Sequence, residues 1–213
     1  NGKCSDPMPL KYYYIMSCFR HEKPQAGRSR EFFQFGTEMF GADTPAADAT
    51  VIALAYSVLT RLGLSGVRLH LNSIGCKECR PAFRAALTEH FSSHTEEICE
   101  TCRDRLAKNP LRLLDCKSPV CSAIAKRAPR TVDHLCEACA DHFAKLCEIL
   151  DAMGIPYVVD PAIVRGLDYY TRTVFEFVAE GIAAQSTVCG GGRYDGLVES
   201  LGGPALSGIG FGM

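Results

Sequence analysis

Twelve cysteines in 213 residues place the strongest constraint on how this chain can fold. One turn of backbone can point both sulfurs of a short-spaced pair at a single ion, and eight thiolates are what two tetrahedral Cys4 zinc sites require. Eight of the cysteines form four such pairs within one stretch of the chain: Cys76/Cys79, Cys99/Cys102, Cys116/Cys121 and Cys136/Cys139.

We expect the pairs to meet two by two, so that one group brings the ends of this stretch together and a short loop closes the other. The groups expected are Cys76/Cys79 with Cys136/Cys139, and Cys99/Cys102 with Cys116/Cys121. Up to two structural Zn²⁺ sites would then stabilise a unit too small to have a deep core of its own. The alternative is that these cysteines are reduced or redox-active thiols.

Composition limits the class of protein further. Hydrophobic residues make up 47% of the chain, enough for a core, and the net charge of −1 provides no overall basic field. A nucleic acid partner must therefore be met by a local patch or by parts of a longer chain. Apolar runs fall short of a membrane span, so we expect no membrane partner, no secretory signal and a cytoplasmic location. The ends, Asn1 and Met213, suggest a fragment of something longer.

Two strand-like runs near the start are joined by a basic loop with proline and glycine, which predicts an antiparallel hairpin over residues 12–40. Side chains alternate along a strand, so Gln34 and Glu38 share one face of the second strand with Phe32. A carboxylate on an apolar face is costly without a partner. The alternative is a solvated sheet face.

The middle of the chain predicts a division into a core and an insertion. Residues 45–62 have helical periodicity and residues 67–72 alternate as a strand, whereas 81–94 and 131–153 are again helical and 156–160 return to the sheet. We therefore expect residues 1–74 and 154–213 to form the core, incomplete at both ends, and residues 75–153 to form a helical insertion that carries the four cysteine pairs.

The chemistry is concentrated near the C-terminal end. Arg165-Gly-Leu-Asp168-Tyr169-Tyr170 precedes a strand-like run, as if a small charged or aromatic ligand lay at its entrance. A further strand over 185–189 is followed by Gly190-Gly-Gly-Arg193-Tyr194, where glycines permit close approach of backbone to a ligand. A last strand is expected over residues 206–213.

Taken together, these stretches resemble the histidyl-tRNA synthetases, a family of class II aminoacyl-tRNA synthetases. Residues 19–28 and 35–41 are similar to the second class II motif, residues 165–170 to the first histidine-specific motif, and residues 190–196 to the second. The resemblance implies an α+β fold: a mainly antiparallel sheet flanked by helices, with a helical insertion. The first and third class II motifs would lie outside this chain, which puts the activity of this piece alone in doubt.

The resemblance implies a histidine–tRNA ligase, which joins histidine and ATP, with Mg²⁺, into histidyl-adenylate and transfers histidine to tRNA(His). It also implies a homodimer for the full-length protein. In-line attack at the α-phosphate needs cations around it. By resemblance, Arg20 holds the α-phosphate, Glu22 helps fix the adenine and Arg28 reaches the terminal phosphates. Arg165 would act as an electrophile on the opposite side, near the substrate carboxylate, because arginine stays protonated and offers a fork of donors.

The same resemblance gives candidates for histidine recognition. Glu38 and Tyr170 would read the imidazole, and Gln34 would bind the amino acid with Tyr169 and Tyr194 beside it. Buried polar groups reject side chains without ring N–H groups, because the site's own polar atoms would then be unpaired. No general base is assigned.

Two other functions remain open. The non-catalytic paralogue that serves as regulatory subunit of ATP phosphoribosyltransferase shares the family's fold and would bind histidine without activating it. The intact set of motif residues argues against that alternative, because a silent paralogue need not keep phosphate-binding arginines. The set consists of Arg20, Glu22, Arg165, Tyr169 and Tyr170. The third possibility is a zinc-stapled interaction domain with no small-molecule site.

Overall fold

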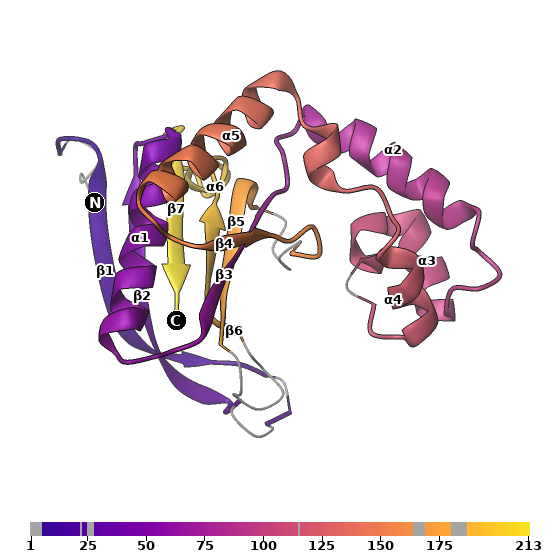
Figure 1. Cartoon of the computed structure of the whole chain (residues 1–213), viewed down its shortest axis with the longest axis horizontal. Coiled ribbons are helices and arrows are strands. Elements are labelled where there is room, and N and C mark those ends of the chain that lie inside the picture. Colours follow the sequence, from indigo (N-terminus) through magenta and orange to yellow (C-terminus); the bar gives the residue numbers. More distant parts are fainter. Residues whose placement is uncertain (1–5, 22, 25–27, 115, 164–168, 180–186) are drawn as a thin grey trace.

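The computed structural model describes residues 6–21, 23–24, 28–114, 116–163, 169–179 and 187–213. A seven-stranded sheet runs through them in the order β1-β2-β7-β6-β5-β3-β4 (Figure 1). Neighbouring strands are antiparallel, except that β3 and β4 are parallel, so the expected mainly antiparallel sheet is confirmed. The strands are β1 (Leu10–Phe19), β2 (Glu31–Phe40), β3 (Val67–Ser73), β4 (Tyr157–Val159), β5 (Thr171–Ala179), β6 (Thr187–Arg193) and β7 (Gly208–Gly212).

Six α-helices and two 3₁₀ turns are assigned in the described residues. They are α1 (Pro45–Arg61), α2 (Cys79–Ser92), α3 (Glu100–Lys108), η2 (Pro110–Leu113), α4 (Pro119–Ala125), η3 (Thr131–His134), α5 (Glu137–Ala152) and α6 (Leu197–Ser200). The predicted first helix is confirmed as α1, which Thr44 caps and which Gly63 follows in a left-handed conformation. Among these helices, none has both the length and the apolar character that crossing a membrane requires.

Helices α1 and α5 cover one face of the sheet (Figure 1). Ile52 and Ala55 of α1 and Leu146 and Leu150 of α5 are buried there in one cluster with residues of the sheet, such as Phe175. On β2, Met39 belongs to this core and Phe35 packs against it, so the alternate residues Gln34 and Glu38 face the other way, as the alternation predicted. The opposite face of the sheet is therefore left for the polar residues.

The segment between β3 and α5 has a small apolar core of its own. Its buried residues come from α2, α3, α4 and the turns between them: Phe83, Leu87, Phe91, Ile98, Cys102, Leu113, Cys121 and Ile124. In Figure 1 these helices lie to one side of the sheet, and α5 leads back from them onto it. The exact limits of the insertion, residues 75 and 153, stay a prediction.

Two elements differ from the expected ones. The helix expected over residues 131–153 is interrupted after η3, because Cys136 adopts an extended conformation and serves as the N-cap of α5. Its backbone N–H donates to the Cys79 sulfur at 3.1 Å instead of to a helical carbonyl. The glycine triplet Gly190–192 lies inside β6 and not in a loop after it.

Candidate functional site

A cavity of about 670 Å³ lies over β2, β6 and β7, next to α6. Gln34 and Glu38 enter it from β2, and Tyr169, Tyr170 and Tyr194 from the segments beside β5 and β6. The structure thus brings together the five described residues that the resemblance suggested for histidine binding. Their roles remain predictions, but they surround one space.

Two hydrogen bonds fix polar groups in this cavity. The hydroxyl of Tyr194 donates to Oε2 of Glu38, and Nε2 of Gln34 donates to the hydroxyl of Tyr14 at 2.8 Å. Tyr14 comes from β1 and was missed by the sequence analysis. The signal was available in principle, since Tyr14 pairs with Gly36, the residue between Gln34 and Glu38 on their face of the neighbouring strand.

Burial decides the protonation of these groups. It raises the pKa of Glu38, and the hydrogen bond from Tyr194 lowers it only in part. Burial and the charge of Glu38 raise the pKa of Tyr194, and burial raises that of Tyr14. The phenols therefore remain protonated at neutral pH, so the cavity offers hydroxyl groups together with one carboxyl group.

Glycines in β7 and β6 make room for these side chains. A Cβ atom at Gly210 would overlap the carboxyl group of Glu38, and one at Gly212 would lie 2.6 Å from Nε2 of Gln34. A Cβ atom at Gly192 would lie 2.9 Å from the ring of Tyr170. The glycine triplet therefore permits a close approach, as expected, but the group that approaches Gly192 is the ring of Tyr170, a side chain of the protein itself.

Arg20 lies on the same side of the sheet as Gln34. Its guanidinium stacks over the ring of Phe32, with Cζ 3.8 Å from the centroid, and Phe32 shares a strand face with Gln34. Arg28 is half-buried in the chain segment before β2. Glu22 and Arg165, the other residues suggested for ATP and catalysis, lie outside the described residues, so the proximity of Arg165 to Arg20 is not tested.

On the opposite side of β6, a buried carboxylate that sequence analysis missed joins four elements. Asp48 of α1 is fully buried and accepts hydrogen bonds from His142 of α5 at 2.8 Å and from Thr173 of β5 at 2.5 Å. Arg193, also fully buried, donates to it from β6 through Nε at 3.0 Å and through Nη2. The signal was its place on α1, one turn before the core residues Val51 and Ile52.

Hydrogen-bond partners hold Asp48 in its charged form. Burial alone would raise the pKa of Asp48, but hydrogen bonds from His142 and Arg193, with the guanidinium charge, lower it overall. Arg193 uses its remaining donors on the carbonyl of Ala42 at 3.1 Å and on Asp195 at 2.8 Å. This network fixes the backbone on both sides of Tyr194.

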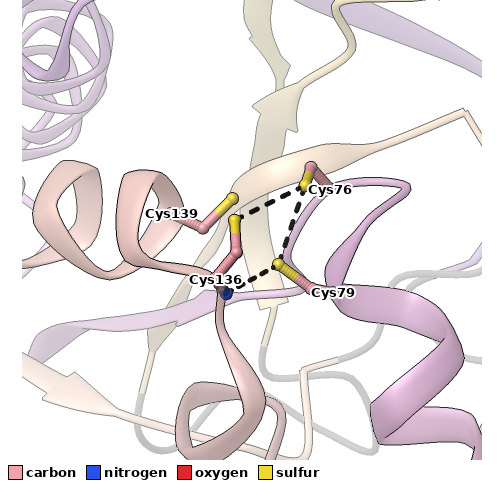
Figure 2. A group of neighbouring side chains, drawn as sticks. All are labelled: Cys76, Cys79, Cys136 and Cys139. Atoms are coloured by element: carbon pink, nitrogen blue, oxygen red, sulfur yellow. Dashed lines mark hydrogen bonds between the residues drawn. The ribbon is translucent and has the colours of Figure 1, made fainter.

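The four cysteine pairs form two clusters, grouped as the spacing predicted, and in each the four sulfurs lie within 4.8 Å of one another. The junction cluster consists of Cys76, Cys79, Cys136 and Cys139, and the insertion cluster of Cys99, Cys102, Cys116 and Cys121. Figure 2 shows the junction cluster, formed by the loop before α2, the start of α2 and the start of α5.

The sulfur spacing fits a tetrahedral ion. Sulfurs about 2.3 Å from one Zn²⁺ lie about 3.8 Å apart. Cys76 is 3.7 Å from Cys79 and 3.8 Å from Cys136, sulfur to sulfur, far beyond a disulfide bond. In the insertion cluster the sulfurs of Cys99 and Cys116 are 4.0 Å apart.

Each cluster also contains a backbone hydrogen bond to sulfur. The N–H of Cys136 donates to Cys79, as described above, and that of Cys99 donates to Cys121 at 3.2 Å. Burial pushes the pKa of Cys76 up, but backbone N–H groups outweigh it and bring the value to about 7. The N–H of Cys102 likewise lowers the pKa of Cys99 to about 7. Burial instead raises the pKa of Cys102 and of Cys139, so in each cluster the backbone hydrogen bonds favour the thiolate, the form that binds metal, at one sulfur.

Comparisons with known proteins agree with the fold and the motifs. The family model described as histidyl-tRNA synthetase matches residues 2–213. The histidine–tRNA ligase of Caldanaerobacter subterraneus subsp. tengcongensis is 51% identical over 213 residues, which are 100% of this chain and 51% of that protein. The crystal structure of apo S. aureus histidyl-tRNA synthetase is similar with a TM-score of 0.76 and 37% identity, over 99% of this chain and 50% of that one.

A more distant structure has a double description. It is an ATP phosphoribosyltransferase regulatory subunit/histidyl-tRNA synthetase from Bacillus halodurans C, with a TM-score of 0.67 and 25% identity over 100% of this chain and 58% of that one. The chain spans about half the length of the curated relatives it matches. With a family model over nearly its whole length, the chain belongs to the histidyl-tRNA synthetase family.

Proposed function

We propose that this chain is the histidine-activating part of a histidine–tRNA ligase. The observation that supports this best is the cavity in which Gln34, Glu38, Tyr170 and Tyr194 meet, on the same side of the sheet as Arg20. The reaction would join histidine and ATP into histidyl-adenylate, release pyrophosphate, and then pass histidine to tRNA(His).

The cavity's polar groups suit an imidazole ring. A carboxylate accepts a hydrogen bond from one ring N–H, and a protonated phenol can donate to an unprotonated ring nitrogen. We assign these roles to Glu38 and Tyr170, with Tyr194 holding Glu38 in place. Gln34, held by Tyr14, would bind the amino acid with Tyr169 beside it. A side chain without ring N–H groups would leave Glu38 with Tyr194 as a partner but without the hydrogen bond from the ring, and would be rejected.

The cations would act on the phosphates. Arg20 would hold the α-phosphate and Arg28 the terminal phosphates, with Glu22 near the adenine, and Mg²⁺ would accompany ATP. Arg165 would stabilise the negative charge that moves onto the α-phosphate as the histidine carboxylate attacks it. Electrostatic stabilisation of this kind is usually the largest single contribution to catalysis. Arg165 would also lie near that carboxylate.

The partners and compartment belong to the same proposal. We expect tRNA(His) and a second copy of the full-length protein as partners, and the cytoplasm as the place of reaction. Free thiols in all eight paired cysteines suit a reducing compartment.

The direct test is histidine-dependent exchange of pyrophosphate into ATP, measured for this chain and for a full-length protein that contains it. We expect exchange with histidine alone among the amino acids, at least in the full-length protein, and loss on Arg20→Ala. Histidine binding without exchange in the full-length protein would favour the regulatory paralogue instead. The similarity to that paralogue is weaker, because the structure described as a regulatory subunit/histidyl-tRNA synthetase is 25% identical to this chain.

We propose further that residues 75–153 form an insertion stabilised by two Zn²⁺ ions. The ligands would be the four sulfurs of the junction cluster and the four of the insertion cluster. Protein purified with zinc in the medium should contain two equivalents per chain, and Cys102→Ser should reduce this to one. A metal content near zero in the unaltered protein would leave the alternative of reduced thiols.

A further inference from the structure

The two cysteine clusters differ in their connection to the histidine cavity. The insertion cluster is part of the apolar core formed by α2, α3 and α4. The junction cluster instead follows directly on β3, whose end pairs with the start of β5 beside Tyr170. This asymmetry suggests a different consequence for each ion.

Backbone hydrogen bonds tie the junction cluster to the cavity. Ile74 donates to the carbonyl of Arg172 at 2.8 Å, and Arg172 donates in turn to the carbonyl of Gly75 at 2.8 Å. Arg172 is in the left-handed conformation with φ 53°, where non-glycine residues are strained and need support from their surroundings. Cys76 is the next residue after Gly75, so the ligand loop and the strained residue share one set of hydrogen bonds.

A side chain provides a second connection. Arg80 follows Cys79 on α2, and its Nη2 donates to the carbonyl of Tyr170. Because the guanidinium is charged, this is one of the stronger kinds of hydrogen bond in a protein. The ring of Tyr170 lies in the cavity and its exposed fraction is 7%, so a shift of its backbone moves a buried ring that has little room.

Gly75 packs closely against Cys79, one of the four cysteines of the junction cluster. Its φ is +66°, and a Cβ atom there would lie 2.6 Å from Cβ and 3.0 Å from Sγ of Cys79. The loop is therefore packed directly on a ligand sulfur, and the geometry at the sulfurs fixes where the carbonyl of Gly75 points.

We infer that Arg80 is a positioning residue, and that metal in the junction cluster sets the place of Tyr170 and with it the affinity for histidine. Metal in the insertion cluster stabilises only the insertion. The inference rests on the proposed histidine and zinc sites.

A matched pair of variants tests the side-chain link. Arg84 lies one turn after Arg80 on α2 and donates to the carbonyl of Lys108, inside the insertion, at 3.1 Å. With both clusters loaded with Zn²⁺, Arg80→Ala should weaken histidine binding about tenfold or more in calorimetry, as the loss of one charge-assisted hydrogen bond implies. ATP affinity and the two equivalents of zinc should be unchanged. Arg84→Ala should leave histidine affinity within about twofold, and Arg80→Lys should recover part of it.

A second readout does not depend on histidine. In protein labelled with 3-fluorotyrosine, the ¹⁹F resonance of Tyr170 can be assigned by its absence in Tyr170→Phe. Adding Zn²⁺ to metal-free protein should shift that resonance. The shift should persist in Cys102→Ser and be lost in Cys139→Ser, each of which removes one buried ligand of one cluster.

Three results would overturn the inference. The first is equal histidine affinity in Arg80→Ala and Arg84→Ala. The others are a Tyr170 resonance that does not shift when Zn²⁺ is added, or a shift that is lost in Cys102→Ser and kept in Cys139→Ser. If no histidine binds even to the zinc-loaded protein, the proposed function fails while the fluorine shift still decides the coupling. A protein that takes up no zinc removes both the metal proposal and this one.

Discussion

Arg193 and Tyr194 are neighbours in the chain, yet they belong to two polar clusters of opposite design. Arg193 meets Asp48 under α1, where both side chains are fully buried and their partners come from the protein itself. Tyr194 meets Glu38 in a cavity wide enough for a small molecule. The first, which we call the closed cluster, has all its partners within the protein and links the sheet to α1 and α5. The second, which we call the open cluster, has polar groups that a bound molecule could reach. A buried charge is thus stabilising in one case and available for recognition in the other.

The largest effect is expected from removing the charge of the closed cluster. Asp48→Asn leaves Arg193 buried without its counter-charge, which should cost about 3–5 kcal/mol of unfolding free energy. Denaturant titration followed by circular dichroism measures it. The control is Asp160→Asn, which disturbs the half-exposed pair with His70 at 2.8 Å and should cost less than about 1 kcal/mol. Equal losses in the two variants would contradict the distinction.

The open cluster should show the reverse pattern, with a large effect on binding and a small one on stability. Glu38→Gln keeps an acceptor for Tyr194 but removes the negative charge that we assign to the imidazole. Histidine affinity should fall about 10- to 100-fold, the loss of a hydrogen bond to a charged group, while unfolding free energy changes by no more than about 1 kcal/mol. Calorimetry and denaturant titration on the same preparation check both, and a loss of stability without loss of binding would refute the assignment.

The smallest effect separates the clusters by pH. The pKa of Asp48 is lowered in the folded protein, so its stabilisation is complete above the ordinary value of about 3.9 and is lost as pH falls below it. The pKa of Glu38 is raised, so the folded protein holds that proton longer and stability falls as pH rises through and above about 4.3. The loss of unfolding free energy in Asp48→Asn should therefore shrink below about pH 4. The unfolding free energy of Glu38→Gln relative to the parent protein should instead rise as pH rises past about 5. Parallel curves for parent and variants would contradict both signs.

Local pattern was sufficient for much of the fold. Alternation placed Gln34 and Glu38 together on one face of β2, because alternation depends only on neighbouring residues. The places of the cysteine pairs, at the two ends of the insertion and within it, predicted which pairs meet. The resemblance, and not periodicity, supplied Tyr170 and Tyr194 as cavity residues. The interruption at Cys136 escaped detection, since an extended residue there is required only by a sulfur 57 positions away.

Contacts between distant segments account for what was missed. Asp48 and Arg193 are 145 residues apart, and nothing near either one reveals the partner. Tyr14 lines the cavity from β1 and bonds to Gln34 on the next strand, a contact that depends on how the two strands pair. The strand order is likewise invisible locally, because β7 pairs not only with β6, the strand before it, but also with β2 near the start of the chain.

That placement of β7 has a consequence for biosynthesis. Gly36 of β2 pairs with Gly212 of β7, so the hairpin of β1 and β2 leaves the ribosome long before the strand that joins it to β6. At roughly 5–20 residues per second, the interval is on the order of ten seconds. Throughout that time the edge of β2 lacks its partner strand and is open to pairing with other nascent chains.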